Sequence, residues 1–311
     1  LRRQNRQTSL DVPDSGGKLM RQILAIGIPI TLSNSAMSII TLVDTKIVLG
    51  RLRDIPALAD SAAELFGQYT FGMNLINLPP SFVFPVTMSL IPFAAAALTR
   101  RDHAEAGRIV SSGFRIVAVL AIPAGVGLSV VGGPALQMLY PLRQADAIAA
   151  GPHMRWLGIA CVFMCLMNLT NVILQIYGKE MIPIWTVIAG GVTKVVMNYI
   201  LVGNPAINIH GAPISTLCCY VVIVGLNLFF VWKYSPEKPR YLQIFAKPAI
   251  DSALMGGAVW AVHGFLSRAL FSVLSSGERT VERASYMTNA AATLCGILAG
   301  VIVYAILVVA L

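Results

Sequence analysis

Long apolar segments are the sequence feature that most narrows the fold of this chain. Eight such segments lie near residues 22–49, 66–98, 109–131, 154–178, 182–202, 213–233, 247–273 and 285–311. Each has about the 20 residues or more that a helix needs to cross the hydrocarbon core of a bilayer. The segments are continuously apolar, whereas the strands of a membrane barrel alternate in polarity. They therefore predict an all-α integral membrane protein.

Composition and charge agree with a membrane protein. Of the 311 residues, 56% are hydrophobic and 12% are charged, and the mean hydropathy of +0.73 is outside the range of soluble globular proteins. The net charge of +9 comes from lysines and arginines that concentrate in alternate loops. The positive-inside rule then places both ends of this chain and Tyr234–Lys247 in the cytoplasm, with Asn204–Gly211 and Gly277–Arg283 outside. The bilayer is the expected partner, and nucleic acid is not.

Lys194 is the most informative charged residue, because apolar residues surround it from Ile182 to Val202. A lysine near mid-membrane costs roughly 2.5–3.5 kcal/mol on insertion scales, so such residues usually face a bundle interior or a wet cavity. We interpret Lys194 as a cavity residue; the alternatives are a side chain that snorkels to the interface or one that pairs with a buried acid. On the cavity interpretation, Lys194→Met is expected to fold at least as well as wild type while losing function.

Polar residues share helical faces with Lys194 and in the preceding segment. Thr193 and Asn198 fall on the same side as Lys194, and Asn168, Asn171 and Gln175 recur at spacings of three and four. Buried amides of this kind either join helices by hydrogen bonds or line a cavity. The sequence leaves both readings of the amide face open.

The first apolar segment carries a polar stripe and ends in charged residues. The stripe includes Asn34, Ser38 and Thr41, which are further candidates for the cavity. Asp44 follows it. This carboxylate is either an interfacial acid or an intramembrane proton or cation site, so we name it as the ion-coupling candidate.

Prolines interrupt the second apolar segment, which is too long for one perpendicular crossing. Pro79, Pro80 and Pro85 each lack a backbone donor, and we expect them to kink or break the helix toward protein or water. After the third apolar segment, the Gly/Pro-rich stretch 132–141 is expected to form an outer loop.

No pattern in the chain indicates catalysis or a bound cofactor. The five cysteines all fall within apolar segments, and the four histidines show no ligand spacing. Phosphate-binding glycine motifs are also missing from the sequence. We therefore expect no enzyme, no metal and no cofactor.

Several segments resemble one family of membrane proteins. The most distinctive are VDT at Val43–Thr45, NLP at Asn77–Pro79, the stretch around Lys194 and INIHGAPIST at Ile207–Thr216. They resemble polysaccharide biosynthesis proteins related to stage V sporulation protein B. These belong to the multidrug/oligosaccharidyl-lipid/polysaccharide (MOP) exporter superfamily, which includes lipid II flippases and MATE antiporters.

The resemblance implies a MATE/MOP-like helical bundle. By analogy, residues 22–234 form the second six-helix lobe and residues 248–311 add two C-terminal transmembrane helices. Residues 1–21 are then a cytoplasmic tail or a severed interlobe loop, and residues 235–247 a basic cytoplasmic linker. Since the sequence opens on a polar tail without a methionine, we expect it to be the C-terminal part of a longer protein whose N-terminal lobe is a partner.

The resemblance also implies a function in a bacterial plasma membrane. The expected activity is flipping of a lipid-linked saccharide on a polyprenyl pyrophosphate carrier, for polysaccharide or peptidoglycan export. Lys194 would contact the anionic group, and the amides and the first-segment stripe would contact sugar or phosphate. The alternatives are a MATE-like cation-coupled exporter of small molecules that uses Asp44, and a non-transporting scaffold or incomplete gene product.

Overall fold

The computed structural model describes residues 16–274 and 281–310. Within these ranges every long element is an α-helix, as the apolar segments predict. The helices are α1 (Gly16–Arg53), α2 (Ala62–Ile76), α3 (Leu78–Thr99), α4 (His103–Leu139), α5 (Gln144–Ala150), α6 (Met154–Ile176), α7 (Met181–Leu201), α8 (Gly211–Tyr234), α9 (Tyr241–Leu274) and α10 (Val281–Ala310), with short 3-10 helices η1 (Pro141–Arg143), η2 (Gly151–His153) and η3 (Asn208–His210). The predicted tail up to residue 15 and residues 277–280 of the predicted outer loop lie outside the described residues.

Seven of the eight predicted membrane crossings overlap helical segments that could span a membrane. Seven segments of the described chain are long and apolar enough to span a membrane: Ala62–Thr99, His103–Leu139, Pro141–Ile176, Met181–Leu201, Asn208–Tyr234, Tyr241–Leu270 and Ser285–Val309. The first predicted segment, 22–49, lies within the 38-residue helix α1. The prediction of an all-α, multi-pass membrane protein is therefore confirmed.

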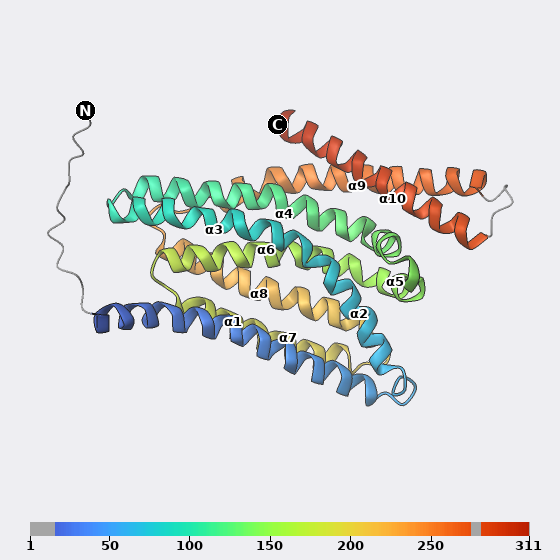
Figure 1. Cartoon of the computed structure of the whole chain (residues 1–311), viewed down its shortest axis with the longest axis horizontal. Coiled ribbons are helices and arrows are strands. Elements are labelled where there is room, and N and C mark those ends of the chain that lie inside the picture. The colour runs from blue at the N-terminus through green and yellow to red at the C-terminus, as the bar shows by residue number, and fades with distance from the viewer. Residues whose placement is uncertain (1–15, 275–280, 311) are drawn as a thin grey trace, which may run out of the picture.

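The long helices run side by side, with α6 near the centre (Figure 1). α6 packs against α3, α4 and α8, whereas α1 packs mainly against α7 at the lower edge of the view. The α9–α10 hairpin covers α4 on the opposite edge. Helix α1 and the α9–α10 hairpin thus lie on opposite sides of the central helices.

A line of small and medium apolar residues makes α6 the core of the bundle. Leu157, Cys161, Cys165, Leu169 and Ile173 follow one another at intervals of four and are all buried. Residues four apart occupy one side of a helix, so this line presents a continuous apolar surface to the neighbouring helices.

Large apolar side chains cover the outside of the bundle. Phe82 of α3 is 76% exposed and Trp185 of α7 is 65% exposed. In water such exposure would be costly, whereas a lipid environment accepts it without penalty. The exposed residues are thus consistent with a surface that faces the bilayer or another transmembrane segment.

The second apolar segment breaks at Asn77, between α2 and α3. Pro80 has no N–H for the carbonyl of Ile76, which would be its partner in a continuous helix. The thiol of Cys161 on α6 instead donates to this carbonyl at 3.3 Å. Pro79 and Pro80 lie in the first turn of α3, where proline is tolerated, and Pro85 lies inside α3.

The expected outer loop at 132–141 is wrong, because α4 continues to Leu139. Its glycines serve helix packing. A methyl group on Gly132 would lie 2.8 Å from Cε of Met154, and one on Gly133 would lie 3.1 Å from Cα of Gly151. The Gly/Pro pattern is typical of a turn, but here its glycines allow α4 to approach the start of α6 closely.

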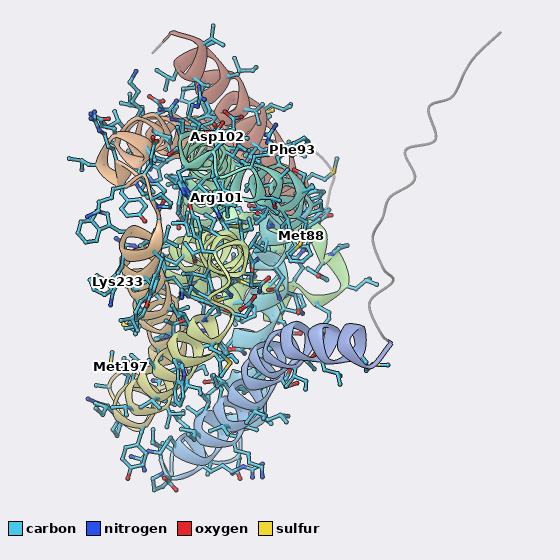
Figure 2. All side chains as sticks on the ribbon, turned by 90° about the vertical axis from the view of Figure 1, so that its left-hand side faces the viewer. Met88, Phe93, Arg101, Asp102, Met197 and Lys233 are labelled. Atoms are coloured by element: carbon cyan, nitrogen blue, oxygen red, sulfur yellow. The ribbon has the colours of Figure 1, made fainter. Side chains whose placement is uncertain are left out.

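One end of the bundle collects basic residues from several connections. Figure 2 looks at this end and labels Arg101 and Asp102 between α3 and α4, and Lys233 near the end of α8. Lys179, in the α6–α7 connection, lies 4.9 Å from the ring centroid of Tyr234 at the same end. The predicted linker 235–247 is only partly a connection, since α9 already begins at Tyr241.

Candidate functional site

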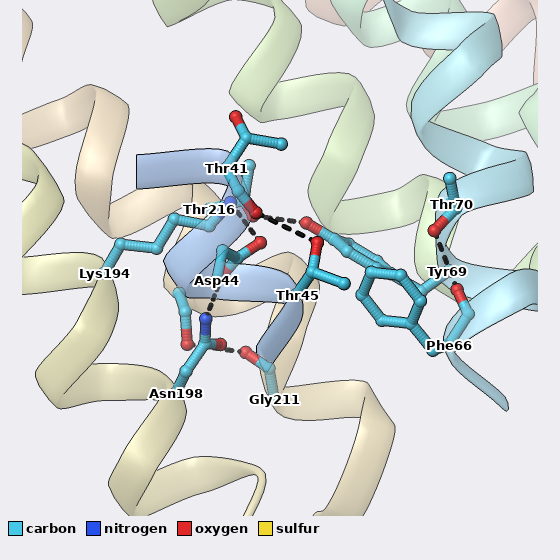
Figure 3. Close-up of polar contacts among 11 residues, drawn as sticks. Thr41, Asp44, Thr45, Phe66, Tyr69, Thr70, Lys194, Asn198, Gly211 and Thr216 are labelled. Atoms are coloured by element: carbon cyan, nitrogen blue, oxygen red, sulfur yellow. Dashed lines mark hydrogen bonds and ion pairs between the residues drawn. The ribbon is translucent and has the colours of Figure 1, made fainter. Parts of the chain in front are cut away.

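A buried ion pair joins α1 to α7. Nζ of Lys194 lies 2.8 Å from Oδ2 of Asp44, and the two residues are 8% and 5% exposed. Figure 3 shows the lysine side chain reaching from α7 toward the carboxylate on α1. Pairing with a buried acid is one of the alternatives that the sequence leaves open for Lys194, but the sequence does not identify Asp44 as that acid.

Asn198 completes the arrangement around Asp44. It lies one turn beyond Lys194 on α7, is fully buried, and donates a hydrogen bond from Nδ2 to Oδ1 of Asp44. Each carboxylate oxygen of Asp44 therefore has a donor. We call Asp44, Lys194 and Asn198 the charged site.

Close packing between α1 and α7 makes the charged site possible. Gly191 lies one turn before Lys194, and a methyl group there would collide with the side chain of Ile40 on α1. Glycine thus lets the two backbones approach at the level of the ion pair. The short separation brings the Asp44 carboxylate within reach of both α7 side chains.

A cavity of about 390 Å³ adjoins the charged site. Asp44 and Lys194 line it together with residues of α1, α2, α6 and α8. The lining residues are Ile40, Thr41, Asp44, Thr45, Phe66, Tyr69, Thr70, Met73, Asn74, Asn77, Met164, Lys194, Thr216, Cys219 and Tyr220. The break between α2 and α3 therefore opens onto this cavity through Asn77.

A hydrogen bond joins α2 to α8 in the wall of the cavity. The hydroxyl of Tyr69 lies 2.8 Å from Oγ1 of Thr216, and both residues are buried. Tyr220 lies one turn after Thr216 on α8 and lines the same cavity. The lining therefore combines two paired charges with phenol, hydroxyl and amide groups.

The paired charges determine what this cavity can do chemically. The ion pair is locally neutral, and each member is the other's counter-ion within the low-dielectric bundle. An anionic ligand group would compete with Asp44 for Lys194. A proton or a cation would compete with Lys194 for Asp44. Binding at this site is thus coupled to separation of the pair.

Three of the predicted site residues line the cavity: Lys194, Asp44 and Thr41. Asn198 reaches the site through its bond to Asp44. Thr193 is half-buried and donates to the carbonyl of Ala189, and Ser38 is exposed on α1; neither lines the cavity. The side chain of Asn34 lies outside the described residues.

The predicted amide face lies elsewhere in the bundle. Asn171 is half-buried and accepts a hydrogen bond from Nδ2 of Asn227 at 2.8 Å. Asn227 also donates to Thr170 at 3.0 Å and accepts from Thr186 at 2.7 Å. We call these four residues the amide cluster; it joins α6, α7 and α8. Asn168 and Gln175 are half-buried and do not line the cavity.

The sequence did not predict several of the residues that line the cavity. Asn74 and Asn77 lie three apart directly before the prolines, and Thr216 and Tyr220 lie four apart in the sixth apolar segment. Each pair shows helical spacing, which marks a common face. Tyr69 carries no such signal, because a single tyrosine in an apolar segment is equally compatible with simple packing.

Comparisons with known proteins agree with the resemblance in the sequence. Residues 12–98 match the polysaccharide biosynthesis protein family. The chain is 27% identical over 269 residues to the uncharacterized membrane protein YabM of Bacillus subtilis, covering 86% of this chain and 48% of YabM. It is 22% identical to the lipid II flippase MurJ of Bacillus subtilis (62% of this chain, 36% of MurJ). It is 21% identical to the probable multidrug resistance protein NorM of Bacillus licheniformis (70% and 46%).

Solved structures show a similar fold. An outward-facing multidrug resistance MATE family transporter of the MOP superfamily aligns with a TM-score of 0.52 and 16% identity, over 93% of this chain and 68% of that one. A MOP superfamily transporter from Pyrococcus furiosus, reported to have a binding pocket of reverse polarity, aligns with a TM-score of 0.52 and 17% identity, over 89% and 62%. The chain spans about half the length, or less, of the curated relatives that it matches.

Proposed function

We propose that this membrane protein belongs to the MOP exporter superfamily and forms one lobe of a flippase for a lipid-linked saccharide in a bacterial plasma membrane. The observation that carries the proposal is the cavity of about 390 Å³ that is lined by Lys194. Flippase and polysaccharide biosynthesis relatives support the same substrate class.

The groups that line the cavity suit such a substrate. A lysine ammonium can bind a pyrophosphate, and hydroxyl and amide groups can bind saccharide hydroxyls. When the pyrophosphate binds Lys194, the Asp44 carboxylate loses its counter-ion and repels the ligand. Asp44 thus opposes tight binding of the anion, which favours release after the ligand has crossed the membrane.

A second lobe is part of the proposal. The chain covers about half or less of its curated relatives. In the proposed two-lobe transporter, the other half would face α1, α2 and α3. Transport would then require the two lobes together. We propose that the N-terminal lobe of the same protein supplies the second wall of the substrate pathway.

The alternative function is cation-coupled export of small molecules. The buried carboxylate of Asp44 in the cavity lining favours it, as do the multidrug transporter relatives. In this scheme a proton or cation displaces Lys194 from Asp44. The coupling ion and the exported molecule would then alternate at one carboxylate.

Asp44→Asn distinguishes the two functions. The variant keeps the lysine and removes its counter-ion, so purified protein should bind a short-chain prenyl pyrophosphate saccharide at least as tightly as wild type. A cation-coupled exporter should instead lose binding of cationic dyes. A scaffold would bind neither ligand specifically, and that result would contradict both transport proposals.

Transport itself is tested in a strain that lacks the complete protein. We expect Lys194→Met to leave lipid-linked saccharide on the cytoplasmic face, and Lys194→Arg to restore part of the export, because both cations contact phosphate with different geometry. Expression must be matched in the membrane fraction. Full export by the Met variant would exclude Lys194 as the phosphate contact.

The proposed orientation places the basic end of Figure 2 in the cytoplasm. Cysteines introduced at Asn208 and Glu278 should react with an impermeant reagent from outside, and a cysteine at Glu237 should not. This orientation rests on the positive-inside rule. The reverse labelling pattern would invert the proposed direction of transport.

A further inference from the structure

A second cavity, of about 490 Å³, lies at the end of the bundle opposite to Arg101 and Lys233. It is formed by α4 and by the segments that lead into α6 and α8. Its polar lining residues are Ser129, Gln137, His153, Arg155, Trp156 and His210. It shares no lining residue with the cavity at Lys194, so the two cavities can be tested separately.

Two histidines from distant parts of the sequence meet in this cavity. The ring centroids of His153 and His210 are 4.9 Å apart. His153 is only 2% exposed, and its Nδ1 has no hydrogen-bond partner within the described residues. Buried polar atoms are normally satisfied, so this nitrogen remains available to a hydrogen-bond partner.

The same two histidines are the N-cap residues of long helices. His153 precedes α6, which has 23 residues, and His210 precedes α8, which has 24 residues. In neither case does the cap side chain accept a bond from the first turn. Each helix continues a 3-10 turn, because the N–H of Met154 donates to the carbonyl of Gly151 and the N–H of Gly211 donates to the carbonyls of Asn208 and Ile209. The start of each helix therefore contributes its cap histidine to the cavity lining.

The charge at the cavity is positive. Arg155, in the first turn of α6, is exposed and lines the cavity. No aspartate or glutamate of the described chain lines it. Asp146 is close in the sequence, but its carboxylate is held by Arg143 at 2.8 Å. The cavity therefore offers an anion one guanidinium and two imidazoles.

We propose that the His153–His210 cavity binds a phosphate group. Guanidinium groups recognise phosphate through charge-assisted hydrogen bonds, and imidazole N–H groups can add further donors. The phosphate belongs either to a lipid headgroup or to a free phosphate ion, since both present the same oxygens. Trp156 is 40% exposed beside the cavity, and tryptophans are enriched where membrane proteins cross the headgroup layer.

The free-phosphate arm uses the purified 311-residue chain in detergent. Inorganic phosphate should raise its thermal midpoint and bind saturably in calorimetry. Arg155→Gln and His210→Gln change exposed side chains, and each should weaken this binding about tenfold, the usual effect of losing one charge-assisted hydrogen bond. His103→Gln and Arg108→Gln, both near the start of α4 at the opposite end, are the controls and should bind as wild type does.

The lipid arm uses the same variants in nanodiscs that contain phosphatidylglycerol. Native mass spectrometry should detect a retained phosphatidylglycerol molecule that Arg155→Gln and His210→Gln lose and that both controls keep. Loss of ligand binding in either experiment, limited to the cavity variants, supports the site. The experiment that shows the loss identifies whether the bound phosphate is a free ion or a lipid headgroup. Equal behaviour of cavity and control variants in both arms would overturn the proposal. Lys194 lines the other cavity, so a loss limited to Arg155→Gln and His210→Gln is independent of the flippase proposal.

Discussion

The charged site and the amide cluster are two polar groups inside the same apolar bundle, and they differ in what they leave available. In the amide cluster, the single side chain of Asn227 bonds to Thr170, Asn171 and Thr186, and none of the four residues lines either described cavity. In the charged site, Asp44 and Lys194 bond to each other and also line a cavity. Polar residues in a membrane helix therefore indicate function only when a cavity reaches them.

The difference in charge explains why the two buried groups need different partners. An amide is neutral, so its inward placement needs only hydrogen-bond partners. A carboxylate or an ammonium needs a counter-charge as well, and breaking a buried pair leaves an uncompensated charge. We therefore expect a substitution in the charged site to cost more stability than one in the amide cluster, and a charged ligand to perturb the charged site more.

The largest expected effect comes from removing one member of the ion pair. Lys194→Met should destabilise the chain by about 3–5 kcal/mol, because Asp44 is left buried without its cation. This reverses the expectation from the sequence that the variant folds at least as well as wild type. The measurement is unfolding in mixed micelles, with Lys46→Met, an exposed lysine on α1, as the control.

The double variant Asp44→Leu/Lys194→Met sharpens this first prediction. It removes both charges, so most of the lost stability should return. Wild-type stability in the Lys194→Met single variant would show that water compensates Asp44, and that the site is wetter than the ion pair indicates.

Asn227→Leu should have the next largest effect. It removes three hydrogen bonds, worth roughly 0.6 kcal/mol each in a membrane protein, so we expect a loss of about 2 kcal/mol. Ligand binding at Lys194 should not change. Asn168→Leu is the matched control, since the described structure gives this half-buried α6 amide no hydrogen bond. A binding defect in Asn227→Leu at matched stability would show that the amide cluster contributes to the cavity after all.

Tyr69→Phe and Thr186→Val form a matched pair with smaller effects. Each removes one buried hydroxyl, whose hydrogen bond is 2.8 Å long in the cavity wall and 2.7 Å long in the amide cluster. Both should cost roughly 0.6 kcal/mol of stability. Only Tyr69→Phe should weaken binding of the prenyl pyrophosphate saccharide, measured by calorimetry. Equal binding in the two variants would remove Tyr69 from the list of ligand contacts.

The prolines should have the smallest effect on stability and a visible effect on shape. Alanine at Pro79, Pro80 and Pro85 restores the donor for the Ile76 carbonyl, so α2 and α3 should join into one straighter helix. Spin labels at the exposed positions Ala63 and Phe93 should then move apart in pulsed electron resonance measurements. Pro92→Ala, deeper in α3, should leave that distance unchanged. An unchanged distance in the triple variant would show that packing, rather than proline, bends this segment.

Much of the fold was predictable from local sequence properties. A span of apolar residues in a bilayer has to satisfy its backbone groups internally, so apolar length alone determines the transmembrane helices. The prolines likewise predicted the break between α2 and α3. Residues 132–141 show the limit of local signals, because a glycine can indicate either a turn or a close contact between two helices. Only the position of Met154 and Gly151 against Gly132 and Gly133 decides between them.

The sequence by itself determined that this chain spans a membrane as a helical bundle and that Lys194 and Asp44 require a special environment. It did not determine that these residues are partners, since they are separated by about half of the chain and lie on helices that meet only after packing. Tertiary structure also assigned Asn171 to the amide cluster and brought His153 to His210. A helical face can be read from spacing, but what covers that face depends on which helices pack together, and this information is not local in the sequence.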